Sequence, residues 1–146
     1  NLIDLILPTT EDTPGALEVN VPEFLDLYAS KVYTEEKQNN LKDGIKAVMT
    51  ELNVSNNKNV NLKTEDYNTL LSKYLRADKA QLDELKSNLE ESNVLDTLKL
   101  LRDFAVWAYK TSEQVGETVL AYDPVPGKQI GCISLEEATG GKSWSL

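Results

Sequence analysis

Hydrophobic positions recur every three or four residues through most of this chain, which predicts a series of amphipathic helices. A first helix ends at Pro8, a second begins at Pro22, and a third begins after Thr34, a suitable N-cap. The second helix takes its apolar positions from Phe24, Leu25, Leu27, Tyr28 and Val32, and the buried stripe of the third is Leu41, Ile45, Val48, Met49 and Leu52. The asparagine-rich segment 53–63 has no period, so we expect an exposed loop there.

The next part of the chain continues this pattern and adds one helix of a different kind. Thr64 is predicted to cap a fourth helix, and a short amphipathic helix follows it. The inner positions of these two helices are Tyr67, Leu70, Leu71, Tyr74 and Leu75, then Leu82, Leu85 and Leu89. From Val94 to Tyr109 there are two stripes, one of Val94, Leu95, Leu98, Leu101, Ala105 and Ala108, the other of Leu100, Phe104 and Trp107. A helix with two apolar faces is usually packed on both, so we expect this one at the centre of a bundle.

The pattern changes after one more short helix, which is predicted to be capped at residues 111–113 and to end near Gly116. From residue 119 to 146, glycines and prolines recur without a helical period and with little strand alternation. Such long irregular segments are uncommon in compact domains unless they are functional or disordered. The sequence therefore predicts one all-α domain, with a multi-helix bundle over about residues 1–118 and a long irregular, extended tail over about residues 119–146.

The tail holds the residues that we predict to bind a partner. Its prolines restrict the backbone and favour a stiff arm, and tyrosine and tryptophan are enriched among interface hot spots. The candidate residues are Tyr122, Pro124, Pro126, Gly127, Ile130, Cys132 and Trp144, with Ile133 as a further apolar anchor. Two interpretations stay open, and both can hold together: the arm packs on the chain's own helices, or part of it covers a partner.

Composition restricts the chemistry that this chain can perform. Its 146 residues carry a net charge of −9, which argues against nucleic acid as a partner because phosphate binding needs clustered Lys and Arg. There is no histidine and one cysteine, so Ser-His-Asp catalysis, common zinc sites and c-type haem attachment are excluded. The adjacent acids Glu35-Glu36, Glu90-Glu91 and Glu136-Glu137 are interpreted as solvated surface groups. We predict no catalytic, cofactor-binding or metal-binding residue in this chain.

Membrane insertion and export are considered from the apolar runs. No run approaches the roughly 18 residues that span a bilayer. The chain begins at Asn1, directly before an apolar stretch, and we expect that an amino-terminal segment has been lost from it. An export signal is one form that such a segment takes.

Two sets of motifs lie at opposite ends of the chain. The amino-terminal motifs are Ile6-Leu7-Pro8-Thr9, Thr13-Pro14-Gly15-Ala16 and Val21-Pro22-Glu23-Phe24. The carboxy-terminal motifs are Ser112-Glu113, Tyr122-Asp123-Pro124-Val125-Pro126-Gly127, Gly131-Cys132-Ile133 and Trp144. Both sets bracket nearly the whole chain, and together, in this order, they resemble the signature of one known family, the gluconate 2-dehydrogenase subunit 3 family.

The resemblance implies a small, non-catalytic subunit of a membrane-associated dehydrogenase. It implies a large flavoprotein partner of the glucose-methanol-choline type, which carries FAD and oxidises a sugar or sugar acid. It also implies a multihaem cytochrome c subunit that holds haem c, and a location in the periplasm or on the outer face of the bacterial inner membrane. The small subunit is expected to assist maturation or export of the large one.

Two other readings compete with this hypothesis. The chain can be an exported helical binding module with a different partner, in which case no flavoprotein gene lies beside its own. It can also be an enzyme that uses carboxylates, which predicts a concave pocket with two or more converging Asp or Glu side chains.

Overall fold

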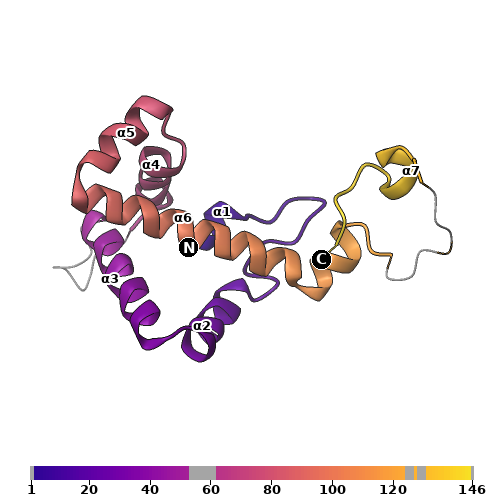
Figure 1. Ribbon diagram of the computed structural model, residues 1–146, viewed down its shortest axis with the longest axis horizontal. Coiled ribbons are helices and arrows are strands. Elements are labelled where there is room, and N and C mark those ends of the chain that lie inside the picture. The colour runs from indigo at the N-terminus through magenta and orange to yellow at the C-terminus, as the bar shows by residue number, and fades with distance from the viewer. Residues whose placement is uncertain (1, 53–61, 124–126, 128–130, 146) are drawn as a thin grey trace.

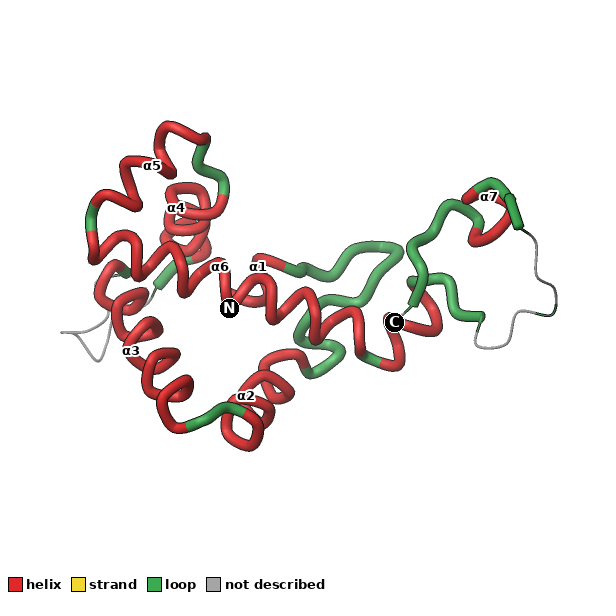
Figure 2. Tube along the Cα trace, in the orientation of Figure 1, coloured by secondary structure: helices red, strands yellow, loops and turns green. Residues whose placement is uncertain are grey.

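A computed structural model describes residues 2–52, 62–123, 127 and 131–145 of the chain. These residues form eight helices and no named strand. The helices are α1 (Leu2–Ile6), α2 (Val21–Val32), α3 (Glu35–Glu51), α4 (Thr64–Leu75), α5 (Lys79–Ser87), α6 (Leu89–Thr111), η1 (Val115–Val119) and α7 (Leu135–Thr139). The predicted all-α fold, a helical bundle followed by a long tail, is confirmed (Figures 1 and 2). Most of the loop predicted over 53–63 lies outside the described residues.

Helix α6 is the element around which the bundle is built (Figure 1). Each of the helices α1 to α5, and η1, contacts it. Leu95, Leu98 and Ala105 of α6 are completely buried, and all three belong to the first predicted stripe. Leu98 follows Leu95 by three residues and Ala105 follows Leu98 by seven, so all three lie on one side of the helix. The prediction of a central helix over this segment is thus confirmed.

Two clusters of buried side chains lie along α6. The cluster near its start joins it to α3, α4 and α5 through Val48, Leu70, Tyr74, Leu85, Val94, Leu95 and Leu98. The cluster near its end joins it to α2 and the α1–α2 connection through Ala16, Val21, Leu25, Ala105 and Ala108. Removing these apolar surfaces from water is the main force that holds the short outer helices on α6, since isolated helices of this length are marginal in water.

The face that α3 buries differs from the prediction. Val48 is buried, as predicted, but Ile45 and Met49 were expected inside and are exposed, and the buried Gly44 was not predicted. A methyl group on Gly44 would lie 3.0 Å from Thr97 Cγ2 and 3.1 Å from Thr97 Cβ, so the glycine lets α3 approach α6 closely. Glycine has no apolar side chain, so a pattern of hydrophobic residues does not reveal its burial. The predicted stripe therefore lies about one residue away from the face of α3 that contacts α6.

Local capping explains where most helices begin. The Thr34 hydroxyl accepts a hydrogen bond from the Lys37 backbone N–H at 3.4 Å, as predicted. The predicted cap at Thr64 is wrong by one residue: Lys63 occupies the cap position, and its N–H donates to Asp66 Oδ2 at 2.8 Å. Leu89 was assigned to the short fifth helix but begins α6, because the Asn88 side chain accepts the N–H of Glu90 at 2.9 Å.

The connection between α1 and α2 is folded tightly against α6. The Tyr109 hydroxyl donates to the carbonyl of Pro14 at 2.7 Å, which ties the connection to the last turns of α6. The N–H of Ala16 donates to the carbonyl of Leu7 at 2.9 Å, and the Ala16 side chain is completely buried. The amino-terminal motifs on which the family resemblance rests therefore have a packing role in this chain.

Candidate partner-binding surfaces

The tail forms a loop that is closed at its base. Ala121 pairs with Trp144 in an isolated parallel bridge, in which the N–H of Ala121 donates to Ser143 O and the N–H of Ser145 donates to Ala121 O, both at 2.8 Å. The Lys142 ammonium also donates to the carbonyl of Thr118 at 3.4 Å. These contacts hold the two ends of the loop beside η1, which continues to Val119 instead of ending near Gly116. Figure 2 shows the loop beyond the end of α6, away from α3, α4 and α5.

The structure places four of the seven predicted tail residues. Tyr122 and Trp144 lie at the closed base of the loop, with 53% and 49% of their surfaces exposed. Gly127 and Cys132 are exposed farther along the loop, and the cysteine is a free thiol. Pro124, Pro126 and Ile130 lie outside the described residues. The base of the loop therefore brings together the two aromatic candidates, which are 22 residues apart in the sequence.

Helix α7 is a feature of the tail that the prediction missed. The Ser134 hydroxyl accepts the N–H of Glu137 at 3.2 Å and donates to Glu137 Oε2 at 2.8 Å, which starts the helix. Gly140, with φ of 62°, ends it in a left-handed conformation that glycine adopts without strain. The Ser134 hydroxyl and N–H lower the pKa of Glu137. The spacing of Ser134 and Glu137, followed by a glycine pair, was the available sequence signal.

A second exposed apolar surface lies on the bundle, and we call it the aromatic face. Phe24, Tyr28 and Tyr33 of the α2–α3 segment meet Phe104 and Trp107 of α6, with ring centroids 5.2 to 5.9 Å apart. Phe24 and Trp107 are each 39% exposed. The second predicted stripe of α6 therefore contributes to this surface and is only partly packed. Five adjoining rings left partly open to solvent are typical of a protein-binding surface.

The acidic pairs are not all simple surface groups. Glu91 makes an ion pair with Lys73, at 2.9 Å between Oε1 and Nζ, and Glu137 caps α7. Glu137 is exposed, as predicted for a solvated surface group, whereas Glu91 is half-buried. Among the residues that the structure describes, no three His, Cys, Asp or Glu side chains are grouped to hold a metal ion.

The comparisons with known proteins identify one family. A family model described as Gluconate 2-dehydrogenase subunit 3 matches residues 1–127, which is most of the chain. The matched region includes the bundle and the first predicted tail motif, and it ends before Cys132 and Trp144. No curated protein and no solved structure matches the chain. Within the described ranges, no helix is both long and apolar enough to cross a bilayer.

Proposed function

The chain belongs to the gluconate 2-dehydrogenase subunit 3 family, and we propose that it binds an FAD-containing large subunit and assists its maturation or export. The family is that of one subunit in a multi-subunit dehydrogenase. In this proposal the flavoprotein performs the oxidation, and a multihaem cytochrome c subunit carries electrons onward. The assembled complex acts in the periplasm or on the outer face of the inner membrane.

The exposed tail loop is the observation that carries the proposal. Four apolar side chains of the tail each leave 42% or more of their surfaces in solvent: Tyr122, Ile133, Leu135 and Trp144. Such a group of apolar side chains is stabilised when a partner covers it. Closure of the loop by the Ala121–Trp144 bridge reduces the entropy that ordering on a partner would cost.

The aromatic face supports the same proposal from the bundle. Aromatic rings have few rotatable bonds, so they bury large areas at a small entropic cost, and they dominate many interfaces. Phe24 and Trp107 are packed against neighbouring rings and are thus held in place before a partner arrives.

Co-expression with the flavoprotein large subunit tests the proposal. The test variant replaces Tyr122, Leu135 and Trp144 with serine, and the matched control is Leu89→Ser, which also removes an exposed apolar side chain. We expect both variants to keep the circular dichroism spectrum and thermal midpoint of the original chain. We also expect the test variant to recover at least tenfold less flavoprotein, because it removes three side chains of the contact.

Equal recovery of flavoprotein by the test variant and the Leu89→Ser control would contradict the proposed role of the tail. A large subunit that does not co-purify with the original chain either would instead favour the alternative of a binding module with a different partner.

A further inference from the structure

Helices α2 and α3 lie on the same side of α6 (Figure 1), and a hollow lies between each of them and α6. The first hollow, of about 380 Å³, lies between α3 and α6 and has Tyr33, Leu41 and Leu100 in its lining. The second, of about 320 Å³, lies between α2 and the end of α6 and has Phe24 and Leu27 in its lining. Tyr33 and Phe24 also belong to the aromatic face, so both hollows adjoin it. We call the aromatic face together with its two hollows the apolar strip.

The apolar strip follows one side of α6. Four residues of this helix line it, at intervals of four, three and four residues: Leu100, Phe104, Trp107 and Thr111. Such intervals keep residues on one side of a helix. Leu100 lines the first hollow and Thr111 the second, and a rise of about 1.5 Å per residue separates them by roughly 16 Å. The strip therefore has the length of about three turns of a second helix.

The shape of the strip matches the side chains of such a helix. An amphipathic helix presents apolar side chains at positions i, i+4, i+7 and i+11, which all lie on one side. The first and last of these can enter the two hollows, while the middle two lie on the packed rings between them. Leu27 and Leu100, one at each hollow, leave 58% and 44% of their surfaces in solvent. Burying these side chains would stabilise a complex in which a helix covers the strip.

The charges at the two hollows select the kind of helix. Glu23 lines the second hollow and Asp96 the first, and neither carboxylate forms an ion pair within the described part of the chain. Lys37 also lines the first hollow, but its ammonium lies over the Tyr33 ring, 5.9 Å from the ring centre. Each end of the strip thus has one carboxylate without a paired cation. A helix with Lys or Arg near both of its ends would supply these cations.

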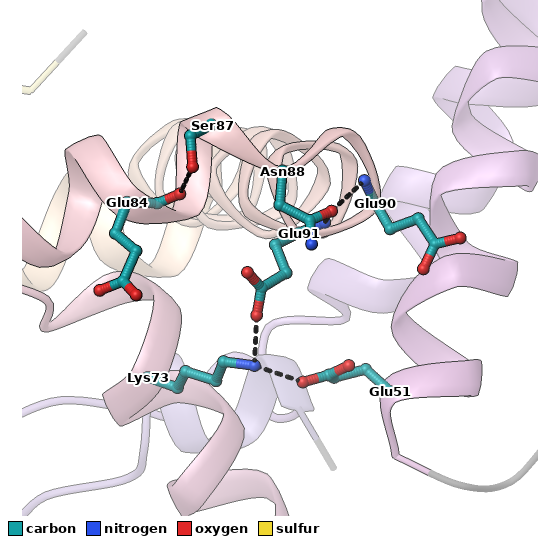
Figure 3. A network of polar contacts seen from close by, with 7 residues as sticks. All are labelled: Glu51, Lys73, Glu84, Ser87, Asn88, Glu90 and Glu91. Carbon is teal, nitrogen blue, oxygen red and sulfur yellow. Dashed lines mark hydrogen bonds and ion pairs between the residues drawn. The ribbon is translucent and has the colours of Figure 1, made fainter.

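The start of α6 differs from the strip in this respect. There, Lys73 Nζ lies 2.8 Å from Glu51 Oε1 and 2.9 Å from Glu91 Oε1, so the chain pairs these two carboxylates itself (Figure 3). The chain as a whole keeps a net charge of −9. A second copy would bring the same acids and the same net charge to the strip, so electrostatic repulsion disfavours it as the occupant.

We propose that the apolar strip binds one amphipathic helix of the flavoprotein large subunit. Its apolar side chains are at positions i, i+4, i+7 and i+11, and Lys or Arg stands beside the first and the last of them. The end side chains fill the hollows, and the basic groups pair with Glu23 and Asp96. The identity of the partner rests on the proposed function, whereas the strip itself can be tested with a synthetic helix alone.

A capped, alanine-rich peptide of about 18 residues is the probe. It carries leucine at positions i, i+4, i+7 and i+11 and lysine in its first and last turns. One control peptide has the same composition with the leucines moved to both sides of the helix, and another has glutamate in place of lysine. Circular dichroism reports the helix content of each free peptide. Binding is followed by the fluorescence of Trp107 in a Trp144→Phe background, which leaves Trp107 as the single tryptophan.

We expect the probe to bind with a dissociation constant on the order of 100 μM, and both controls to bind at least about fivefold more weakly. Leu27→Ser and Leu100→Ser should each weaken binding of the probe by about tenfold. Glu23→Gln and Asp96→Asn should each weaken it by about twofold to threefold, because exposed ion pairs contribute little. The matched control Leu89→Ser removes an exposed leucine at the start of α6 and should leave binding unchanged. Thermal midpoints show that each variant is folded.

Co-expression with the large subunit connects the strip to the complex. A double variant with Leu27→Ser and Leu100→Ser should recover at least about tenfold less flavoprotein than Leu89→Ser does. Full recovery by the folded double variant would show that the complex does not use the strip. A large subunit that is not recovered with the original chain, while the probe still binds, would refute the proposed function and assign the helix to a different partner.

The peptide experiments can also overturn the inference. Equal binding of the peptide with leucines on both sides would remove the role of helical spacing, and equal binding of the glutamate peptide would remove the role of charge. Unchanged binding of the probe to folded Leu27→Ser and Leu100→Ser would place the helix elsewhere. If light scattering gives twice the mass of one chain, and these two variants halve it, the strip belongs to a second copy instead.

Discussion

Replacing Gly44 with alanine sets two effects of known sign against each other. In an isolated helix this change stabilises by about 1 kcal/mol, because alanine has the higher helix propensity. In the folded chain the new methyl group would overlap the Thr97 hydroxyl and lie 3.0 Å from Cγ2 and 3.1 Å from Cβ of the same residue. Rotation of the Thr97 side chain moves its γ atoms but not its Cβ, so the 3.1 Å contact with Cβ would remain.

The overlap must therefore be relieved by separating α3 from α6. The Thr97 hydroxyl also donates to the Asn93 carbonyl at 2.8 Å, which further holds the side chain in place. Overpacking of a buried contact costs typically about 1–3 kcal/mol. After the gain in helix propensity, we expect a net loss of about 1 kcal/mol in the free energy of unfolding, and a midpoint lowered by about 3 °C.

Thermal and urea unfolding of a small variant set measure this balance. Asn39→Ala is the control, because it introduces the same residue at an exposed position of α3 and should stabilise the chain by a few tenths of a kcal/mol. In a Thr97→Ala background the contacts with both γ atoms are removed and only the 3.1 Å contact with Cβ remains, so Gly44→Ala should become close to neutral. If Gly44→Ala raises the midpoint in the original background, the close contact of α3 with α6 is refuted.

Three further predictions concern the α1–α2 connection, the ion pairs and the tail. Tyr109→Phe leaves the Pro14 carbonyl without its partner and should lower the free energy of unfolding by about 1 kcal/mol in urea titrations. The hydrogen bond from Lys73 lowers the folded-state pKa of Glu51, so its contribution is present above the unfolded-state pKa and is lost as pH falls through the folded-state value. Urea midpoints measured between about pH 6 and about pH 3 should fall, and less so in Glu51→Gln. Trp144→Ala lies outside the core clusters and should change the free energy of unfolding by less than about 0.5 kcal/mol.

The features that the sequence predicted correctly are those that depend on residues close together in the chain. The stripe from Val94 to Ala108 identified the central helix, and the hydroxyl of Thr34 identified the start of α3. Both signals are local, since a helix repeats its faces every 3.6 residues and satisfies its first N–H groups with nearby side chains. Helix α7 had an equally local signal in Ser134 and Glu137, but its single turn is too short to show a hydrophobic period.

The contacts between distant segments were not predictable from spacing. Lys73 joins Glu51 and Glu91 only because α4 lies between the end of α3 and the start of α6, and each residue alone resembles an ordinary surface charge. Likewise, Tyr122 and Trp144 are two separate aromatic candidates in the sequence, and the Ala121–Trp144 bridge is what places both at the base of the tail loop. The pattern of apolar residues indicates which face of a helix is buried, but it does not indicate which helix covers that face.

The central claim is that this chain forms a complex with a flavoprotein dehydrogenase subunit. The most direct measurement is light scattering of the mixed proteins during size-exclusion chromatography, with flavin absorbance recorded across the peak. We predict one species whose mass equals the sum of both subunits, with flavin absorbance throughout and with the 16.3 kDa chain depleted from its free position. Two separate peaks, with the flavin only at the mass of the large subunit alone, would contradict the claim.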